Sequence, residues 1–117
     1  MSDSDQTSQP VAAPTKPKPG KRQKPKMLPP YNVVLLNDDD HSFEYVIEML
    51  KVIFGHAEEK GFQMAKEVDT RGRVVVLTTH KERAEFKRDQ IHAYGIDARV
   101  ATCAGSMSAL IEPAEGE

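Results

Sequence analysis

The chain has 117 residues, enough for one ordinary domain and too few for two. Hydrophobic residues make up 38% and charged residues 29%, which indicates a folded domain rather than a fully disordered chain. No apolar run approaches the ~20 residues of a membrane-spanning helix, and the polar start MSDSD lacks the apolar region of a secretory signal. Cys103 is the single cysteine, which excludes an internal disulfide and suits a reducing compartment, so we expect the protein in the cytoplasm. We expect a monomer, although the sequence leaves the oligomeric state open.

The net charge of −2 is divided unevenly along the chain. Residues 1–30 hold six basic and two acidic residues, a net +4, so the remainder carries −6. Seven of the eight prolines fall in the same stretch, which has too few large apolar residues to fold. We expect a disordered basic arm over 1–30, a folded domain over 31–113 and a short acidic tail over 114–117. An arm without aromatic residues, attached to an acidic domain, argues against nucleic-acid binding.

The first half of the predicted domain contains one strand and two helices. The β-branched run YNVVLL from Tyr31 predicts a strand that ends at the polar residues NDDD. Apolar residues recur at helical spacing over Phe43–Phe54, which predicts an amphipathic helix that Gly55 ends. A second helix is predicted over about Ala57–Val68, although Gly61 weakens its helical propensity.

The second half is predicted to start with a buried strand, VVVLTT. Thr79 and Glu82 have capping-box spacing, which predicts a third, largely exposed helix over His80–Tyr94. Asp97–Gly105 is expected to be a loop, and MSALIE from Met107 alternates like a half-buried strand. The order β-α-α-β-α-β predicts a compact α+β domain in which the helices cover one face of a three-stranded sheet.

Five adjacent polar residues, Asn37–His41, follow the first predicted strand. Their oxygens suit Mg²⁺ or Ca²⁺, but no EF-hand spacing follows. One alternative is a solvated turn in which Asp40 or Ser42 caps the next helix. Another is a set of hydrogen-bond acceptors for a cationic ligand at the edge of the sheet.

No pattern in the sequence indicates an enzyme or a cofactor. Walker A, G-x-G-x-x-G and paired-cysteine motifs are absent from the sequence. The histidines His41, His56, His80 and His92 have no metal-binding spacing, and we expect them on the surface. Cys103 has no histidine nearby in the sequence, which argues against a catalytic thiolate. The sequence therefore predicts a binding module without catalysis, metal or cofactor.

The segment LPPYNVVLLNDDDHSFEYVIEMLKVIFG, residues 28–55, resembles the ClpS adaptor family. In both, a strand runs into Asn-Asp-Asp and then into a helix that carries Glu-aromatic-Val-Ile. MAKEVDTRG is loosely similar to the family's M-x-x-x-V-H-x-x-G, and a basic arm that ends in Pro-Pro-Tyr also fits. The resemblance covers about Pro29–Tyr94 and resumes at SMSALIE.

The resemblance implies an adaptor that binds polypeptides with a large hydrophobic N-terminal residue, an N-degron. The adaptor would deliver them to a ClpA- or ClpC-type AAA+ unfoldase, whose pore the basic arm would engage. Asn37, Asp38 and Asp69 would receive the peptide's α-amino group. Glu82 and Lys87 would dock on the unfoldase. Six apolar residues would line the pocket for the first side chain: Leu35, Phe43, Val46, Ala65, Val68 and Met107.

Three departures from the family pattern concern this site. Asp69 stands where the family usually has a histidine, although a carboxylate can still accept from an ammonium group. Phe43 replaces a frequent methionine and Ala65 a larger residue, which would reshape the pocket. Asp97–Gly105 looks like an insertion that alters one rim.

These departures leave open a second function, a regulator that docks on the unfoldase without reading N-termini. A ribosome-associated module is another alternative, because the C-terminal domain of the ribosomal stalk protein shares this general architecture. The Asn-Asp-Asp junction argues against that alternative, which the fold alone could not exclude.

Overall fold

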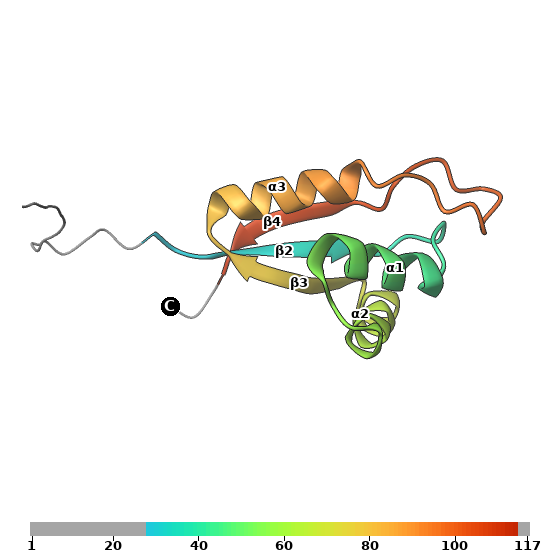
Figure 1. Cartoon of the computed structure of the whole chain (residues 1–117), viewed down its shortest axis with the longest axis horizontal. Helices are drawn as coiled ribbons and strands as arrows, with labels where there is room; N and C mark the ends of the chain where they lie inside the picture. The colour runs from blue at the N-terminus through green and yellow to red at the C-terminus, as the bar shows by residue number, and fades with distance from the viewer. Residues whose placement is uncertain (1–27, 115–117) are drawn as a thin grey trace, which may run out of the picture.

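A computed structural model describes residues 28–114 and contains the predicted α+β architecture (Figure 1). The β-α-α-β-α-β order is confirmed, whereas most of the predicted arm and acidic tail lie outside the described residues. None of the described helices is long and apolar enough to span a bilayer. The elements in chain order are β2 (Tyr31–Leu36), α1 (Phe43–Phe54), α2 (Glu58–Arg71), β3 (Arg73–Thr79), α3 (Lys81–His92) and β4 (Ala109–Pro113).

The sheet is antiparallel, and its first strand in the sequence is its central strand, in the order β3-β2-β4 (Figure 1). Tyr31 pairs with Thr79 of β3 and with Pro113 of β4. The register of β2 against β3 shifts between Val33 and Val34, so that Val76 has no partner in the pairing. Nε2 of His56 lies 2.8 Å from the carbonyl oxygen of Val76. A side chain thus provides a hydrogen bond at the bulge, where ladder pairing is interrupted.

The three helices pack against one face of the sheet. The alternation of buried and exposed side chains along β3 shows which face this is. Val74 and Val76 are buried, whereas Arg73 and Val75 between them are exposed. Burial of each large aliphatic side chain contributes about 1.5–3 kcal/mol. In α3 only Ala84 and Ile91 are buried, as its narrow apolar stripe predicts. The buried residues of α1 are Tyr45, Val46, Met49, Leu50 and Ile53.

The N-terminal ends of α1 and α3 show which of the predicted capping residues are used. Ser42 caps α1, because its side chain accepts from the amide of Tyr45 at 3.2 Å. For α3 the predicted cap Thr79 is wrong: the cap is His80, whose Nδ1 accepts from the amide of Arg83 at 3.4 Å. An imidazole nitrogen here takes the place of the hydroxyl oxygen.

The second helix is longer than predicted and contains a close helix contact. It extends to Arg71, and Gly72 ends it with a φ of 86°. Gly61, expected to weaken this helix, is buried, and a Cβ there would lie 3.4 Å from Cα of Ile47 in α1. The glycine therefore lets the backbones of α1 and α2 approach closely.

Candidate functional site

The polar segment Asn37–His41, called here the acidic segment, begins where β2 ends. The amide of Leu36 donates to the carbonyl of Ser108 at 3.0 Å, and the amide of Asn37 donates to that of Gly72 at 3.0 Å. The segment therefore starts between the chain entering β4 and the C-terminal end of α2. Asp69 is exposed and lies within one turn of Gly72. This arrangement brings Asn37 to the helix end that carries Asp69.

The carboxylate of Asp38 is oriented through one of its two oxygens. Its Oδ1 accepts from the amide of Asp40 at 2.9 Å and lies 2.7 Å from Nδ1 of His41. No residue between 28 and 114 donates to Oδ2, and the side chain is 34% exposed. Asp38 thus presents one oxygen of a fixed carboxylate to a ligand. Asp39 beside it is exposed.

His41 is not on the surface, so the sequence-based expectation is wrong for this residue. Its side chain is 4% exposed, and the ring lies 4.5 Å from the ring of Tyr45, centroid to centroid. Nε2 lies 2.8 Å from the carbonyl oxygen of Gly105, while Nδ1 faces the carboxylate of Asp38. Both nitrogens therefore lie within hydrogen-bond distance of an oxygen atom.

Asp97 fastens the segment Asp97–Gly105, called here the insertion loop, to the start of α1. Asp97 is 1% exposed and accepts from both the amide and the hydroxyl of Ser42 at 2.7 Å. It also accepts from the amide and the guanidinium of Arg99 at 3.0 and 3.2 Å. Burial raises the pKa of Asp97, but these hydrogen bonds outweigh it and lower the pKa to about 2. Sequence reasoning missed this residue, because nothing in the local pattern marks a partner 55 residues away.

Cys103 of the insertion loop contacts a histidine, contrary to the sequence-based expectation. Its Sγ lies 3.3 Å from Nε2 of His41, a contact between residues 62 positions apart. Thr102 also reaches the acidic segment, since its hydroxyl donates to Oδ1 of Asp40 at 3.1 Å. Within residues 28–114, no group of three or more histidine, cysteine or acidic side chains is arranged to hold a metal ion.

The six predicted pocket residues converge in one hydrophobic cluster. Five of them are buried, and Phe43 packs against them while remaining partly exposed. The ring of Phe43 meets that of Phe62 edge-on, at 5.9 Å between centroids. Phe62 is 47% exposed and was not predicted, because it lies off the apolar stripe of α2. The five buried residues are Leu35, Val46, Ala65, Val68 and Met107.

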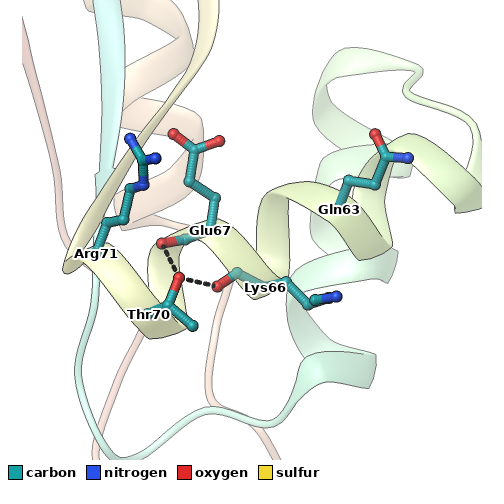
Figure 2. Close-up of a pocket in the computed structure, with 5 residues that line it drawn as sticks. All are labelled: Gln63, Lys66, Glu67, Thr70 and Arg71. Atoms are coloured by element: carbon teal, nitrogen blue, oxygen red, sulfur yellow. Dashed lines mark hydrogen bonds between the residues drawn. The ribbon is translucent and has the colours of Figure 1, made fainter.

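Three surface cavities lined by described residues lie elsewhere. One of about 400 Å³ lies on the exposed face of α2 (Figure 2), where the hydroxyl of Thr70 donates to the carbonyl of Lys66 at 2.9 Å. Two others, of about 260 and 510 Å³, lie between α1 and α2 and share Ile47 and Glu58. None of the three is lined by the six predicted pocket residues. Five of the six are instead buried in the hydrophobic cluster described above.

The two predicted docking residues differ in their surroundings. Glu82 is exposed in the first turn of α3. Lys87 is partly buried, and its Nζ donates to the carbonyl of Ile53 at 2.6 Å. Burial, together with the neighbouring Arg83, lowers the pKa of Lys87. Lys87 therefore supports the C-terminal end of α1, a role that its sequence position does not reveal.

Comparisons with known proteins agree with this fold. Residues 26–99 match the family model described as "ATP-dependent Clp protease adaptor protein ClpS". The ATP-dependent Clp protease adapter protein ClpS of Methylococcus capsulatus is 42% identical over 71 residues, which span 61% of this chain and 67% of that protein. The ClpS of Synechococcus elongatus is 31% identical over 91 residues, which span 77% of this chain and 96% of that protein.

A solved structure is also similar, that of Agrobacterium tumefaciens ClpS2 bound to L-phenylalaninamide. It matches with a TM-score of 0.65 and 28% identity, over 74% of this chain and 98% of that chain. The matched family region includes the acidic segment and all three helices. This chain therefore belongs to the ClpS family, the adaptor proteins of the ATP-dependent Clp protease.

Proposed function

We propose that this adaptor binds polypeptides that begin with a large hydrophobic residue and delivers them, in the cytoplasm, to a ClpA- or ClpC-type unfoldase. The observation that carries the proposal is the carboxylate of Asp38. One of its oxygens is fixed by His41 and Asp40, and no described residue donates to the other. Asp38 lies just beyond the end of β2, two residues after the partly buried Leu36 and three after the buried Leu35. A charged acceptor beside an apolar wall matches the two ends of a hydrophobic N-terminal residue.

The α-amino group of a peptide would be held by Asn37, Asp38 and Asp69. A free α-amino group has a pKa near ~8 and is mostly cationic at neutral pH, so carboxylate and amide oxygens suit it. Each charge-assisted hydrogen bond contributes about 1.5–3 kcal/mol. Asp69 replaces an imidazole by a second carboxylate, which increases the attraction for a cation. The backbone hydrogen bond from Asn37 to Gly72, three residues after Asp69, supports a site in which Asn37 and Asp69 lie near each other.

The first side chain of the peptide would enter the apolar cluster. Burial of a Leu or Phe side chain contributes about 1.5–3 kcal/mol, and micromolar affinity needs only about −8 kcal/mol in total. Because Leu35, Val46, Ala65, Val68 and Met107 are packed together, entry requires a rearrangement. Phe43 is partly exposed at the edge of the cluster and is the residue we expect to move. The relative bound to L-phenylalaninamide supports this site, since that ligand combines an α-amino group with an aromatic side chain.

The test is fluorescence anisotropy with labelled peptides that begin with Phe, Leu, Ile or Arg, and with an N-acetylated Phe control. We expect micromolar binding of Phe and Leu peptides that acetylation abolishes, because acetylation removes the cation. Asp38→Asn should weaken binding about tenfold, as expected for loss of one charged hydrogen bond. Asp39→Asn is the matched control, because it removes the same charge from the exposed neighbour and should bind normally. Binding of the acetylated peptide at full strength would refute an amino-group site.

A second candidate function is favoured by the closed packing of the predicted pocket. An adaptor-like regulator would dock on the unfoldase through Glu82 and Lys87 without reading N-termini. It predicts that no peptide binds in the anisotropy experiment while the chain still competes with other adaptors for the unfoldase. If Phe and Leu peptides bind, the protein is not solely a regulator that ignores N-termini.

A further inference from the structure

A thiol, an imidazole and a carboxylate form a continuous set of contacts under the insertion loop. Sγ of Cys103 lies 3.3 Å from Nε2 of His41, and Nδ1 of the same ring lies 2.7 Å from Oδ1 of Asp38. The side chain of His41 is 4% exposed, whereas Cys103 is partly exposed. The ring is therefore held in place beside a cysteine that is only partly buried.

The cluster pairs a thiol with an imidazole that a carboxylate orients. An imidazole oriented by a carboxylate is the pairing with which proteins activate cysteine toward electrophiles. Two backbone contacts position the sulfur: the amide of Asp97 donates to Sγ at 3.2 Å, and Sγ lies 3.2 Å from the carbonyl oxygen of Gly105. Neither peptide binding nor unfoldase docking, as proposed above, uses Cys103. Cys103 is thus the member of this cluster that has no role in those steps, although it contacts the ring that orients Asp38.

We propose that Cys103 is a site of reversible oxidation that controls the amino-group acceptor Asp38, an inference that rests on the proposed function. First, the thiolate attacks one oxygen of hydrogen peroxide, the O–O bond breaks, hydroxide leaves and takes up a proton, and a sulfenic acid remains. Next, the sulfur of a low-molecular-weight thiol attacks the sulfenic sulfur, and its proton leaves with the hydroxyl group as water. The product is a mixed disulfide. The peroxide is reduced and Cys103 is oxidised.

The modification would act on Asp38 through His41. An added group replaces the S–H hydrogen that can donate to Gly105 and crowds Nε2 of His41, which is already at contact distance. Displacement of the ring removes the contact from Nδ1 that orients the carboxylate of Asp38. We therefore expect the mixed disulfide to weaken peptide binding about tenfold, the effect of losing one charged hydrogen bond to the α-amino group.

The experiment treats the full chain with hydrogen peroxide and then glutathione, and measures three quantities. Intact mass and peptide mapping report the adduct at Cys103, and anisotropy reports the affinity for a Phe peptide. The amide resonance of Asp40, which hydrogen-bonds Oδ1 of Asp38, reports the state of that carboxylate without any peptide. Cys103→Ser should bind the peptide normally and resist the treatment. It also controls for oxidation of methionines, which dithiothreitol does not reverse. His41→Gln, checked for folding by thermal melting, should slow alkylation of Cys103 by iodoacetamide.

The expected result is an adduct at Cys103, a shifted Asp40 resonance and weakened binding, all reversed by dithiothreitol and absent from Cys103→Ser. A thiol that reacts no faster than an unstructured cysteine peptide would overturn the proposal. So would an adduct that leaves the Asp40 resonance and the affinity unchanged. If the reduced chain binds no peptide, the proposed function fails by itself, and the adduct and the Asp40 resonance alone decide whether Cys103 controls Asp38.

Discussion

Asp97 is the residue on which the position of the insertion loop depends. A buried carboxylate is expensive unless it is fully hydrogen-bonded, and four donors from Ser42 and Arg99 satisfy this one. Ser42, which donates to this carboxylate, is also the residue that caps α1. Loss of its charge therefore affects both the loop and the start of the helix that follows the acidic segment.

We predict that Asp97→Asn lowers the free energy of unfolding by about 2–3 kcal/mol, the contribution of hydrogen bonds to a buried charge. Because the folded-state pKa of Asp97 is lowered to about 2 from 3.8, its contribution is present above about pH 4 and is lost as the pH falls toward 2. Urea unfolding from pH 7 to pH 2 measures this. Wild type and Asp97→Asn should converge at low pH. Arg99→Gln, which changes an exposed partner, should have a smaller effect. Parallel curves for wild type and Asp97→Asn would contradict the assignment.

At the scale of elements, one glycine lies at the contact between α1 and α2 and limits the size of side chain that fits there. A methyl group at Gly61 would lie 3.4 Å from Cα of Ile47, an ordinary contact distance, whereas a longer side chain would have no room there. Alanine also has a higher helical propensity than glycine, by about 0.8–1.0 kcal/mol.

A small and a large side chain at Gly61 should therefore change the free energy of unfolding in opposite directions. Gly61→Ala should raise the free energy of unfolding by about 0.5–1 kcal/mol. Gly61→Leu should lower it by about 1–3 kcal/mol, because it overpacks the helix contact. Chemical denaturation at pH 7 measures both. Destabilisation by Gly61→Ala would contradict this prediction, because it would show that α1 and α2 have no room for even a methyl group between them.

The exposed surface of α3 gives a second prediction at this scale. Glu82→Ala should weaken binding to the unfoldase about fivefold, in the range of a rim charge pair, and leave stability unchanged. Lys87→Ala should also lower the free energy of unfolding by about 1–2 kcal/mol, because Ile53 loses a charged hydrogen-bond donor. Binding measured by surface plasmon resonance, with thermal melts as a control, separates the two effects. A normal melting temperature for Lys87→Ala would refute its structural role.

The elements could be predicted from the sequence better than the loop contacts could. The helical spacing of apolar residues over Phe43–Phe54, together with Gly55, predicted both ends of α1. The apolar runs located all three strands of the sheet. The last strand begins at Ala109, two residues later than predicted, because Met107 is core although it precedes the ladder. The contacts of His41, Asp97 and Cys103 could not be predicted, because each joins segments more than 50 residues apart.

At the scale of the whole molecule, charge separates the arm from the domain. Residues 1–30 carry a net +4 and the remainder −6. The proposed binding residues all lie between Leu35 and Met107, and none of them lies in the arm. Peptide binding and delivery should therefore depend on different parts of the chain.

Deletion of residues 1–27 should leave the affinity for a Phe peptide within about twofold, since none of the proposed binding residues lies in that stretch and physiological salt screens charge interactions beyond about 8 Å. The same deletion should abolish degradation of an N-degron substrate by the unfoldase and its protease. A matched control replaces the arm with a sequence of equal length in which serine replaces each Lys and Arg. Loss of peptide binding on deletion would place part of the binding site within residues 1–27.

The pairing of Tyr31 with both Thr79 and Pro113 has a consequence for the synthesis of this protein. The central strand is made first, and its last neighbour is made at the opposite end of the domain. During translation, β2 must wait with an unpaired edge until residues 109–113 have emerged. The acidic segment is oriented by the insertion loop, which emerges only shortly before them. The three-stranded sheet therefore cannot be completed until nearly the whole domain has emerged, and the nascent chain is most prone to aggregate while the edge of β2 is unpaired.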